Sequence, residues 1–270
     1  MFEANQRVRD EFIRWIEQPQ FNPQHAKNWA RLYINDPEAA MCEATYWAVM
    51  SDCGVSVAPN ADLTGKPAPD FVCLKTERKF YVEVTCIREE TATRQTGLNP
   101  NPSFDGKASS YASLNDAIFH ECISKTPQCA GLDAPCIIAI GTFHHQASIL
   151  GVREVFIECL LTGQTNIGVQ FDATEGRCVG EPYEMTRFRS AAFTRIAKSS
   201  VEHARHPISG VLVGGFGCSP PAIFGALHPS PVREFDPTIL DRIPFCCQAI
   251  NLEAGTVGTH WIRGTSLESR

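Results

Sequence analysis

The chain has 270 residues, of which 43% are hydrophobic, and it carries a formal net charge of −6 at pH 7. This length and apolar content are sufficient for one large domain with a substantial core. The negative charge and the lack of a long basic tract exclude a protein that coats nucleic acid over its whole surface, so any such contact must be local.

The twelve cysteines are scattered through the sequence without a CxxC pair or another zinc-ligand spacing. The sequence also contains no signal peptide and no apolar run of membrane length. We therefore expect reduced thiols, no zinc site, no contact with a membrane and a cytoplasmic location.

Residues 1–35 are predicted to form a helical extension of two short helices, because apolar side chains recur at helical spacing around Phe12 and Trp29. A third helix is predicted to follow from residue 37 to residues 52–53. Asp36 would cap its start and Gly54 would end it.

Glu43 lies on this third helix, beside the apolar stripe and one turn from Trp47. A carboxylate at the edge of a buried face needs a partner, which makes Glu43 a candidate site residue. The alternative is an ordinary surface glutamate on an amphipathic helix.

Residues 65–87 are predicted to form a β-hairpin, because two apolar, β-branched runs flank a polar tetrad. If the turn is centred between Thr76 and Glu77, Asp70 lies directly opposite Glu83 on one face of the ladder. Thr85 is two residues further along that face.

The opposite face of the hairpin is apolar throughout and is expected to be buried. Two carboxylates about 5 Å apart on the other face repel each other and raise one pKa, unless a cation lies between them. A hard divalent cation is the simplest such group. The alternative is an exposed hairpin with two solvated acids.

Three further segments follow the hairpin. Residues 88–107 are predicted to be a loop that faces the substrate, and residues 109–125 a helix that ends before Pro127. Residues 135–143 are continuously apolar, as in a buried central strand.

The motif of Pro69-Asp70 followed by Glu83-Val84-Thr85 resembles the PD-(D/E)xK nuclease superfamily, which has the restriction-endonuclease-like fold. The resemblance implies an α/β fold in which helices flank a mixed central sheet. It also implies that Asp70, Glu83 and the carbonyl of Val84 bind Mg²⁺ or Mn²⁺. Glu43 matches an additional acidic residue that this family often carries on the preceding helix.

Thr85 stands where the family has its lysine. Either a lysine from elsewhere replaces it, or the site is weakened or inactive. Lys125 with Gln128 resembles the Lys and Gln of some branches of the superfamily and is the first choice; Lys107 is a second. Lys79 shares the acidic face but lies about 13 Å from Glu83 along the strand.

Beyond residue 143 the pattern predicts a C-terminal α/β elaboration, with strands at 166–171, 177–182 and 208–217 and helices at 152–161 and 186–203. Residues 36–255 are expected to form a single endonuclease-like domain, and residues 256–270 a polar tail.

The predicted helix 186–203 contains the one local basic concentration in this acidic chain. Its side chains could follow the phosphates of a nucleic acid, or could be a solvated face that balances acids elsewhere. The basic residues are Arg187, Arg189, Arg195 and Lys198.

The leading hypothesis is a metal-dependent nuclease that hydrolyses phosphodiester bonds, with DNA as the favoured substrate. Asp70, Glu83, Lys125 and Glu43 would form its catalytic site. One alternative is an inactive endonuclease-like module that binds nucleic acid or protein. Another is a structural α/β domain with a fortuitous match to the motif.

Overall fold

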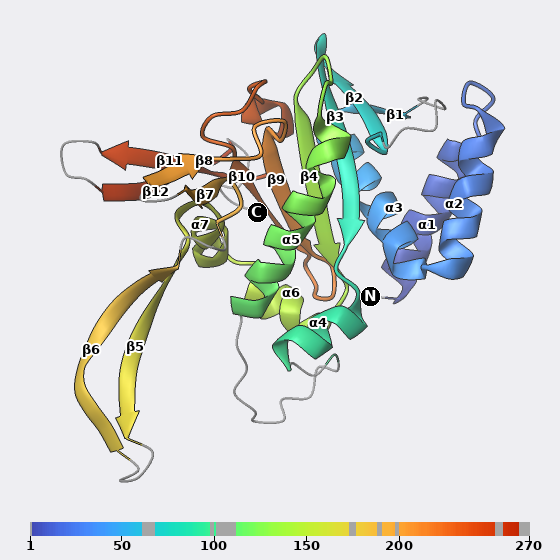
Figure 1. Cartoon of the computed structure of the whole chain (residues 1–270). Helices are drawn as coiled ribbons and strands as arrows, with labels where there is room; N and C mark the ends of the chain where they lie inside the picture. The colour runs from blue at the N-terminus through green and yellow to red at the C-terminus, as the bar shows by residue number, and fades with distance from the viewer. Residues whose placement is uncertain are drawn as a thin grey trace.

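A computed structural model of the chain describes residues 2–60, 68–97, 100, 112–172, 177–187, 191–197, 200–251 and 256–264. Its centre is an eight-stranded mixed sheet in the order β1-β2-β3-β4-β9-β10-β11-β12. Helices cover both faces of this sheet (Figure 1), which confirms the predicted mixed α/β class. The strands of the sheet are β1 (Ser56–Pro59), β2 (Phe71–Lys75), β3 (Arg78–Cys86), β4 (Cys136–Thr142), β9 (Gly210–Gly215), β10 (Ala222–Leu227), β11 (Phe245–Asn251) and β12 (Thr256–Ile262).

The centre of the sheet is parallel. Strands β3, β4 and β9 run in the same direction, and β2 closes onto β3 as an antiparallel hairpin. Strand β4 is buried along its whole length, as predicted for a central strand with both faces covered. The helices are α1 (Phe2–Ile16), α2 (Pro23–Asn35), α3 (Pro37–Asp52), α4 (Glu89–Thr96), α5 (Ala112–Cys129), α6 (His145–Gly151) and α7 (Glu154–Thr162), with a 3₁₀ turn η2 (Pro237–Leu240).

The first three helices lie on one face of the sheet, where they share a core with β2, β3 and β4. The predicted ends of α3 are confirmed. The carboxylate of Asp36 accepts a hydrogen bond from the N–H of Ala39 at the N-terminus, and Gly54 adopts φ +71° just beyond the C-terminus. Helices α5, α6 and α7 cover the other face.

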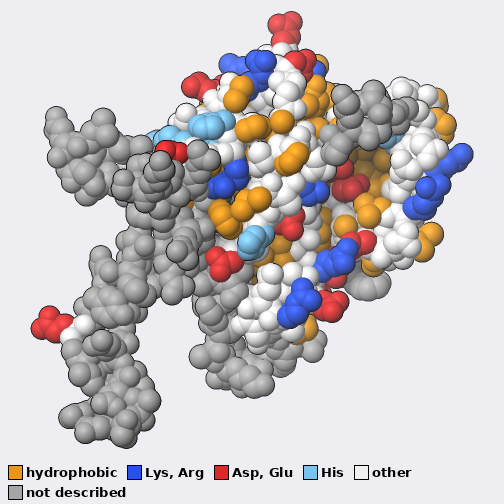
Figure 2. Space-filling model, in the orientation of Figure 1, with side chains coloured by type: hydrophobic (Ala, Val, Ile, Leu, Met, Phe, Trp, Pro, Cys, Tyr) orange, Lys and Arg blue, Asp and Glu red, His pale blue; other side chains and the backbone are white. Residues whose placement is uncertain are grey.

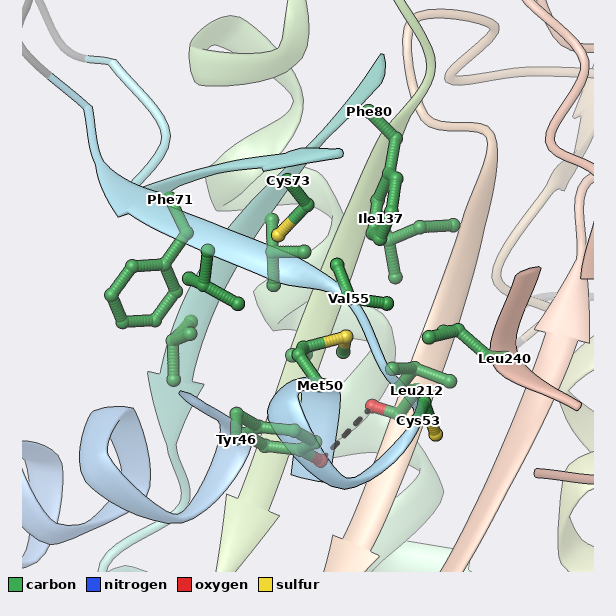
Figure 3. Close-up of a cluster of buried hydrophobic side chains, with 14 of the residues drawn as sticks. Tyr46, Met50, Cys53, Val55, Phe71, Cys73, Phe80, Ile137, Leu212 and Leu240 are labelled. Atoms are coloured by element: carbon green, nitrogen blue, oxygen red, sulfur yellow. Dashed lines mark hydrogen bonds between the residues drawn. The ribbon is translucent and has the colours of Figure 1, made fainter. Parts of the chain in front are cut away.

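Tyr46 fixes α3 on the sheet (Figure 3). Its buried hydroxyl donates to the carbonyl of Ile140 at 2.7 Å and lies 3.5 Å from that of Leu212, so it joins the helix to β4 and β9. Gly214 makes room for it, because a Cβ at that position would lie 2.7 Å from the Tyr46 oxygen. One turn earlier on the same helix, Glu43 is held against the edge of this core.

Two predictions beside the site are wrong in part. Residues 89–96 of the expected loop form α4, whose first turn is acidic and which ends at Gly97 in the left-handed conformation. Helix α5 does not stop at Lys125 but continues past Pro127 to Cys129. A proline this close to the end of a helix removes only one hydrogen bond, and the additional turn carries Gln128 to the site.

The predicted helix at 186–203 is also wrong. Strand β6 (Arg177–Arg187), paired with β5 (Gln164–Asp172), extends into this segment, and β7 (Thr194–Ala197) then pairs with β8 (Ser200–His203). The β-branched residues Thr194, Ile196 and Val201 favour strands, and they outweigh the alanines and arginines that favoured a helix.

Within residues 256–270, expected to be a polar tail, β12 pairs with β11 at the edge of the main sheet. None of the helices in the described ranges is both long enough and apolar enough to cross a membrane.

Candidate functional site

The β2–β3 hairpin has the predicted register. Phe71 pairs with Val82 and Cys73 with Phe80, so one step beyond the ladder Asp70 lies opposite Glu83. The turn residues Thr76 and Glu77 have φ values of 48° and 66°. These angles are typical of the two-residue type I′ turn that matches the twist of paired strands.

Asp70 is held at the end of the hairpin by its partner strand. Its Oδ2 accepts a hydrogen bond of 2.7 Å from the backbone N–H of Val84. The N–H groups of Tyr81 and Ile87 both donate toward β4. Because backbone groups alternate along a strand, the N–H and C=O of Val84 face the other way, toward Asp70.

Glu83 is the most deeply buried acid of the site, with 1% of its surface exposed. Its Oε1 accepts a hydrogen bond of 2.7 Å from the Nζ of Lys125. Gln128, which lines the same cavity, acts to lower the pKa of Glu83. The second oxygen, Oε2, is buried and has no hydrogen-bond partner within the described ranges. An unsatisfied buried carboxylate oxygen is a position where a ligand is expected.

Lys125 therefore lies beside the acidic pair, where the sequence placed it. It projects from α5, which crosses the face of β3 and β4. Of the other two lysines considered, Lys79 donates to Asp133 at 2.9 Å at the far end of β3, and Lys107 lies outside the described residues.

Glu43 approaches the pair from α3 and lines the same cavity. Burial raises its pKa well above the ordinary value, and the negative charges of Asp70 and Glu83 raise it further. Lys125 opposes this effect. The structure thus brings together all four predicted catalytic side chains: those of Asp70, Glu83, Lys125 and Glu43.

The hydroxyl of Thr85 donates to Oε2 of Glu121 at 3.0 Å. Glu121 also lines the cavity, although the sequence analysis did not single it out. It precedes Lys125 by four residues, so both side chains project from the same face of α5. That spacing is the signal that could have identified it.

The cavity around these residues has a volume of about 560 Å³. Among the residues that the structure describes, its walls contain five carboxyl groups and two lysine or arginine side chains, Arg88 and Lys125. Arg88 is paired with Asp36 and Lys125 with Glu83, which leaves three acids of the wall without an ion-pair partner among the residues that the structure places. Figure 2 shows acidic side chains and hydrophobic walls in the hollow between α5 and α2. The unpaired acids are Glu43, Asp70 and Glu121.

Burial dominates the electrostatics of the acidic pair. It raises the pKa of Asp70 to about 6, although the Val84 N–H and Lys125 act to lower it. Burial and then the charge of Asp70 raise the pKa of Glu83 to about 8, against the lowering effect of Lys125 and Gln128. At neutral pH Asp70 is therefore mostly ionised and Glu83 mostly protonated, because Lys125 only partly offsets the effect of burial on Glu83.

These residues fit a hard divalent cation. The free Oε2 of Glu83, the carboxylate of Asp70 and the outward carbonyl of Val84 are the oxygen donors that Mg²⁺ prefers. As the side chains lie, no three His, Cys, Asp or Glu residues of the described ranges form a cluster close enough to hold a metal ion. The protein ligands would thus be two carboxylates and one carbonyl, with water and substrate completing the shell.

The basic segment does not form the expected helix surface. Arg187 is the last residue of β6 and Arg195 belongs to β7, while Arg189 and Lys198 lie outside the described residues. Contact between this segment and nucleic acid remains a prediction from the sequence.

Comparisons of the chain with protein-family models, curated proteins and solved structures give no match.

Proposed function

We propose that the protein is a metal-dependent nuclease that hydrolyses phosphodiester bonds in DNA. The observation that carries this proposal is the convergence of Asp70, Glu83 and Lys125. Two carboxylates on adjacent strands and one lysine from a crossing helix meet in a cavity with an excess of acid.

Each side chain has a distinct part in this chemistry. Asp70, Glu83 and the Val84 carbonyl would hold Mg²⁺ or Mn²⁺, and Glu43, from α3, would bind a second ion or a water molecule of the first. The bound cation supplies a Lewis acid for the scissile phosphate and lowers the pKa of water. Lys125 would keep its proton and stabilise the negative charge that develops on the phosphate. Although burial lowers the pKa of Lys125, the charges of Glu83 and Asp70 hold it above the ordinary value.

The order of the elements supports a restriction-endonuclease-like core. Helix α3, the β2–β3 hairpin, α5 and the buried strand β4 occur in this order along the chain, with β1 and α4 between them. The acidic pair lies on the hairpin and the lysine on α5. Within this proposal, Lys125 takes the place of the motif lysine that Thr85 has replaced.

Cleavage assays test the proposal. Purified protein would be incubated with supercoiled and linear DNA in Mg²⁺, Mn²⁺ or EDTA, beside Asp70→Asn and Glu83→Gln. These changes remove the charge but keep the shape of each side chain. We expect metal-dependent cleavage that each variant abolishes, while the surface change Asp133→Asn leaves it intact. Cleavage that persists in Glu83→Gln at the wild-type rate would overturn the assignment.

A second function is favoured by Thr85, which cannot act as the motif lysine does. In that case the cavity belongs to a module that binds nucleic acid or protein without cleaving it. A double Asp70→Ala, Glu83→Ala variant would then keep both its fold and its binding, and the wild type would show no cleavage in any metal.

A further inference from the structure

Helix α5 and strand β3 contact each other through two matched pairs of side chains in the candidate site. Glu83 accepts a hydrogen bond of 2.7 Å from Lys125, and Thr85 donates one of 3.0 Å to Glu121. Two residues of a strand span about 6.6 Å and four residues of a helix about 6 Å. The two pairs therefore lie side by side, and all four side chains line the same cavity.

The carboxylate of Glu121 is anchored through one oxygen. Its Oε2 accepts the hydrogen bond of Thr85 and a longer one of 3.4 Å from Ser124, one turn later on α5. Within the part of the chain that the structure describes, Oε1 of Glu121 accepts no hydrogen bond. A half-buried carboxylate that is fixed in this way presents its second oxygen to a ligand in the cavity.

The Thr85–Glu121 pair adjoins the ligands proposed for the cation. Val84, whose carbonyl is one of these ligands, separates Glu83 from Thr85 on β3. Because side chains alternate along a strand, Glu83 and Thr85 both point toward α5. Along the strand, a group bound at the Val84 carbonyl has the carboxylate of Glu83 on one side and that of Glu121 on the other.

Hydrolysis of a phosphodiester also requires an acceptor for a proton of the attacking water. Lys125 does not meet this need. Although burial acts to lower its pKa, the charges of Glu83 and Asp70 hold it above the ordinary value, so the amine is already protonated. The lone pairs of Asp70 and Glu83 are directed at the cation in the proposed function.

Three other carboxyl groups of the described residues line the cavity. Asp36 caps α3 and is paired with Arg88, so its oxygens are occupied. Glu43 approaches from α3, which packs on the face of the sheet opposite α5. Glu121 lies on the same face as Lys125 and has one oxygen fixed and one free.

We propose that Glu121 is the general base of the hydrolysis and that Thr85 positions it. Oε1 of Glu121 takes a proton from the attacking water while the water oxygen forms a bond to phosphorus. The bond from phosphorus to the leaving oxygen breaks, and that oxygen takes a proton from solvent. Glu121 then returns its proton to solvent, so one phosphodiester and one water give a phosphomonoester and an alcohol. The inference rests on the proposed function.

Steady-state kinetics of Glu121→Gln test the base. This change keeps the shape of the side chain but removes its ability to accept a proton. We expect kcat to fall about 10²- to 10⁴-fold with little change in KM, as when a general base is removed. The control Asp116→Asn makes the corresponding change at an exposed position of α5 that does not line the cavity, and it should leave kcat unaltered.

The pH dependence separates a base from a merely structural residue. At saturating Mg²⁺, kcat of the wild type should be constant between pH 8 and 9.5. In Glu121→Gln it should rise about 10-fold per pH unit, because hydroxide from solvent then supplies the nucleophile. The ionisable side chains that share the cavity on the hairpin, α3 and α5 are unchanged in this variant: Glu43, Asp70, Glu83, Cys86, His120 and Lys125.

Variants of Thr85 test the positioning. Thr85→Val keeps the shape of the side chain and its preference for a strand but removes the hydrogen bond to Glu121. We expect kcat to fall about 10-fold, as when one hydrogen bond to a charged group is lost. Thr85→Ser retains the hydroxyl and should restore most of the activity. Circular dichroism would verify that all the variants fold.

A calorimetric titration of Mn²⁺ at pH 8.5 provides a readout that is independent of cleavage. Glu121→Gln should bind Mn²⁺ as the wild type does, because the base is not a ligand of the cation. Weaker binding by this variant would make Glu121 a metal ligand and overturn its assignment as the base.

The other outcomes separate this inference from the proposed nuclease. Cleavage by the wild type with an equal kcat in Glu121→Gln overturns the base and leaves the nuclease standing. A lower kcat in Glu121→Gln that stays constant from pH 8 to 9.5 also contradicts the base. If the wild type cleaves in no metal, the nuclease fails, and the base fails with it.

Discussion

At the scale of single residues, we expect the protonation of Asp70 and Glu83 to determine whether a cation binds at the site. Because their pKa values are raised to about 6 and about 8, both are largely protonated at pH 5.5 and ionised only as the pH rises. Protonated carboxyl groups do not bind a hard cation. At subsaturating Mg²⁺, DNA cleavage should thus be low at pH 5.5, rise between pH 6 and 8 and level off above that range.

The rate of DNA cleavage by the wild type, measured from pH 5.5 to 8.5, tests this rise. Lys79→Met, a control variant remote from the cavity, should show the same pH dependence. A rate that is constant from pH 5.5 to 8.5 at subsaturating Mg²⁺ would show that these carboxyl groups do not titrate during cation binding.

Lys125 is predicted to be the cation that acts in place of the motif lysine. Its Nζ lies 2.7 Å from Glu83, and its change to Met removes the charge while the apolar stem remains. We expect kcat to fall about 10²- to 10³-fold, as when one preorganised donor is removed from an active site. Lys79→Met makes the same change at the surface and should leave kcat unaltered. Equal rates for the two variants would exclude Lys125 from catalysis.

The residues that could be predicted are those whose positions depend on local patterns. Asp70 and Glu83 follow from strand alternation and a two-residue turn, and the structure shows the same register. The spacing of Glu121 from Lys125 places it on the same face of α5, but its contact with Thr85 depends on how α5 crosses β3, which is tertiary packing. The hydrogen bond from Thr85 to Glu121 is visible only once both elements are in place.

At the scale of elements, the β2–β3 turn is the least favourable part of the site's scaffold. Thr76 is β-branched and adopts φ 48°, and Glu77 adopts φ 66°, a region that favours Asn and Gly. Thr76→Asn with Glu77→Gly should raise the thermal midpoint by roughly 2–4 °C, from about 1 kcal/mol of relieved strain.

Differential scanning calorimetry measures that shift, and cleavage activity should stay at the wild-type level because the register is kept. A lower midpoint would mean that the native side chains of the turn make contacts worth more than the strain.

The elements that sequence reasoning missed share a physical cause. In residues 186–203, helix-favouring alanine and arginine compete with β-branched residues, and pairing between β7 and β8 decides the outcome. Helix α4 forms in a Thr-rich segment. Burial of Ala92 and Thr96 stabilises the helix, and Gly97 in the left-handed conformation ends it. In both cases tertiary context outweighs weak local propensity.

At the scale of the whole molecule, the net charge of −6 opposes the approach of nucleic acid. With an excess of acid in the cavity as well, affinity for DNA should depend on a divalent cation at the site. We expect a single-stranded oligonucleotide to bind at least about 10-fold more tightly in Ca²⁺ than in EDTA at equal ionic strength.

Fluorescence anisotropy checks this dependence, and the double variant Asp70→Asn, Glu83→Gln should remove it. If the double variant responds to Ca²⁺ as the wild type does, the cation acts elsewhere on the molecule.

The measurement that tests the central claim most directly is a calorimetric titration of Mn²⁺ into metal-free protein at pH 8.5, because it requires no knowledge of the substrate. The wild type should bind Mn²⁺ at the site, and Asp70→Asn and Glu83→Gln should each weaken that binding at least about 10-fold, the cost of about 1.4 kcal/mol. Equal binding by the wild type and both variants, or no binding by any of them, would contradict a metal site built on Asp70 and Glu83.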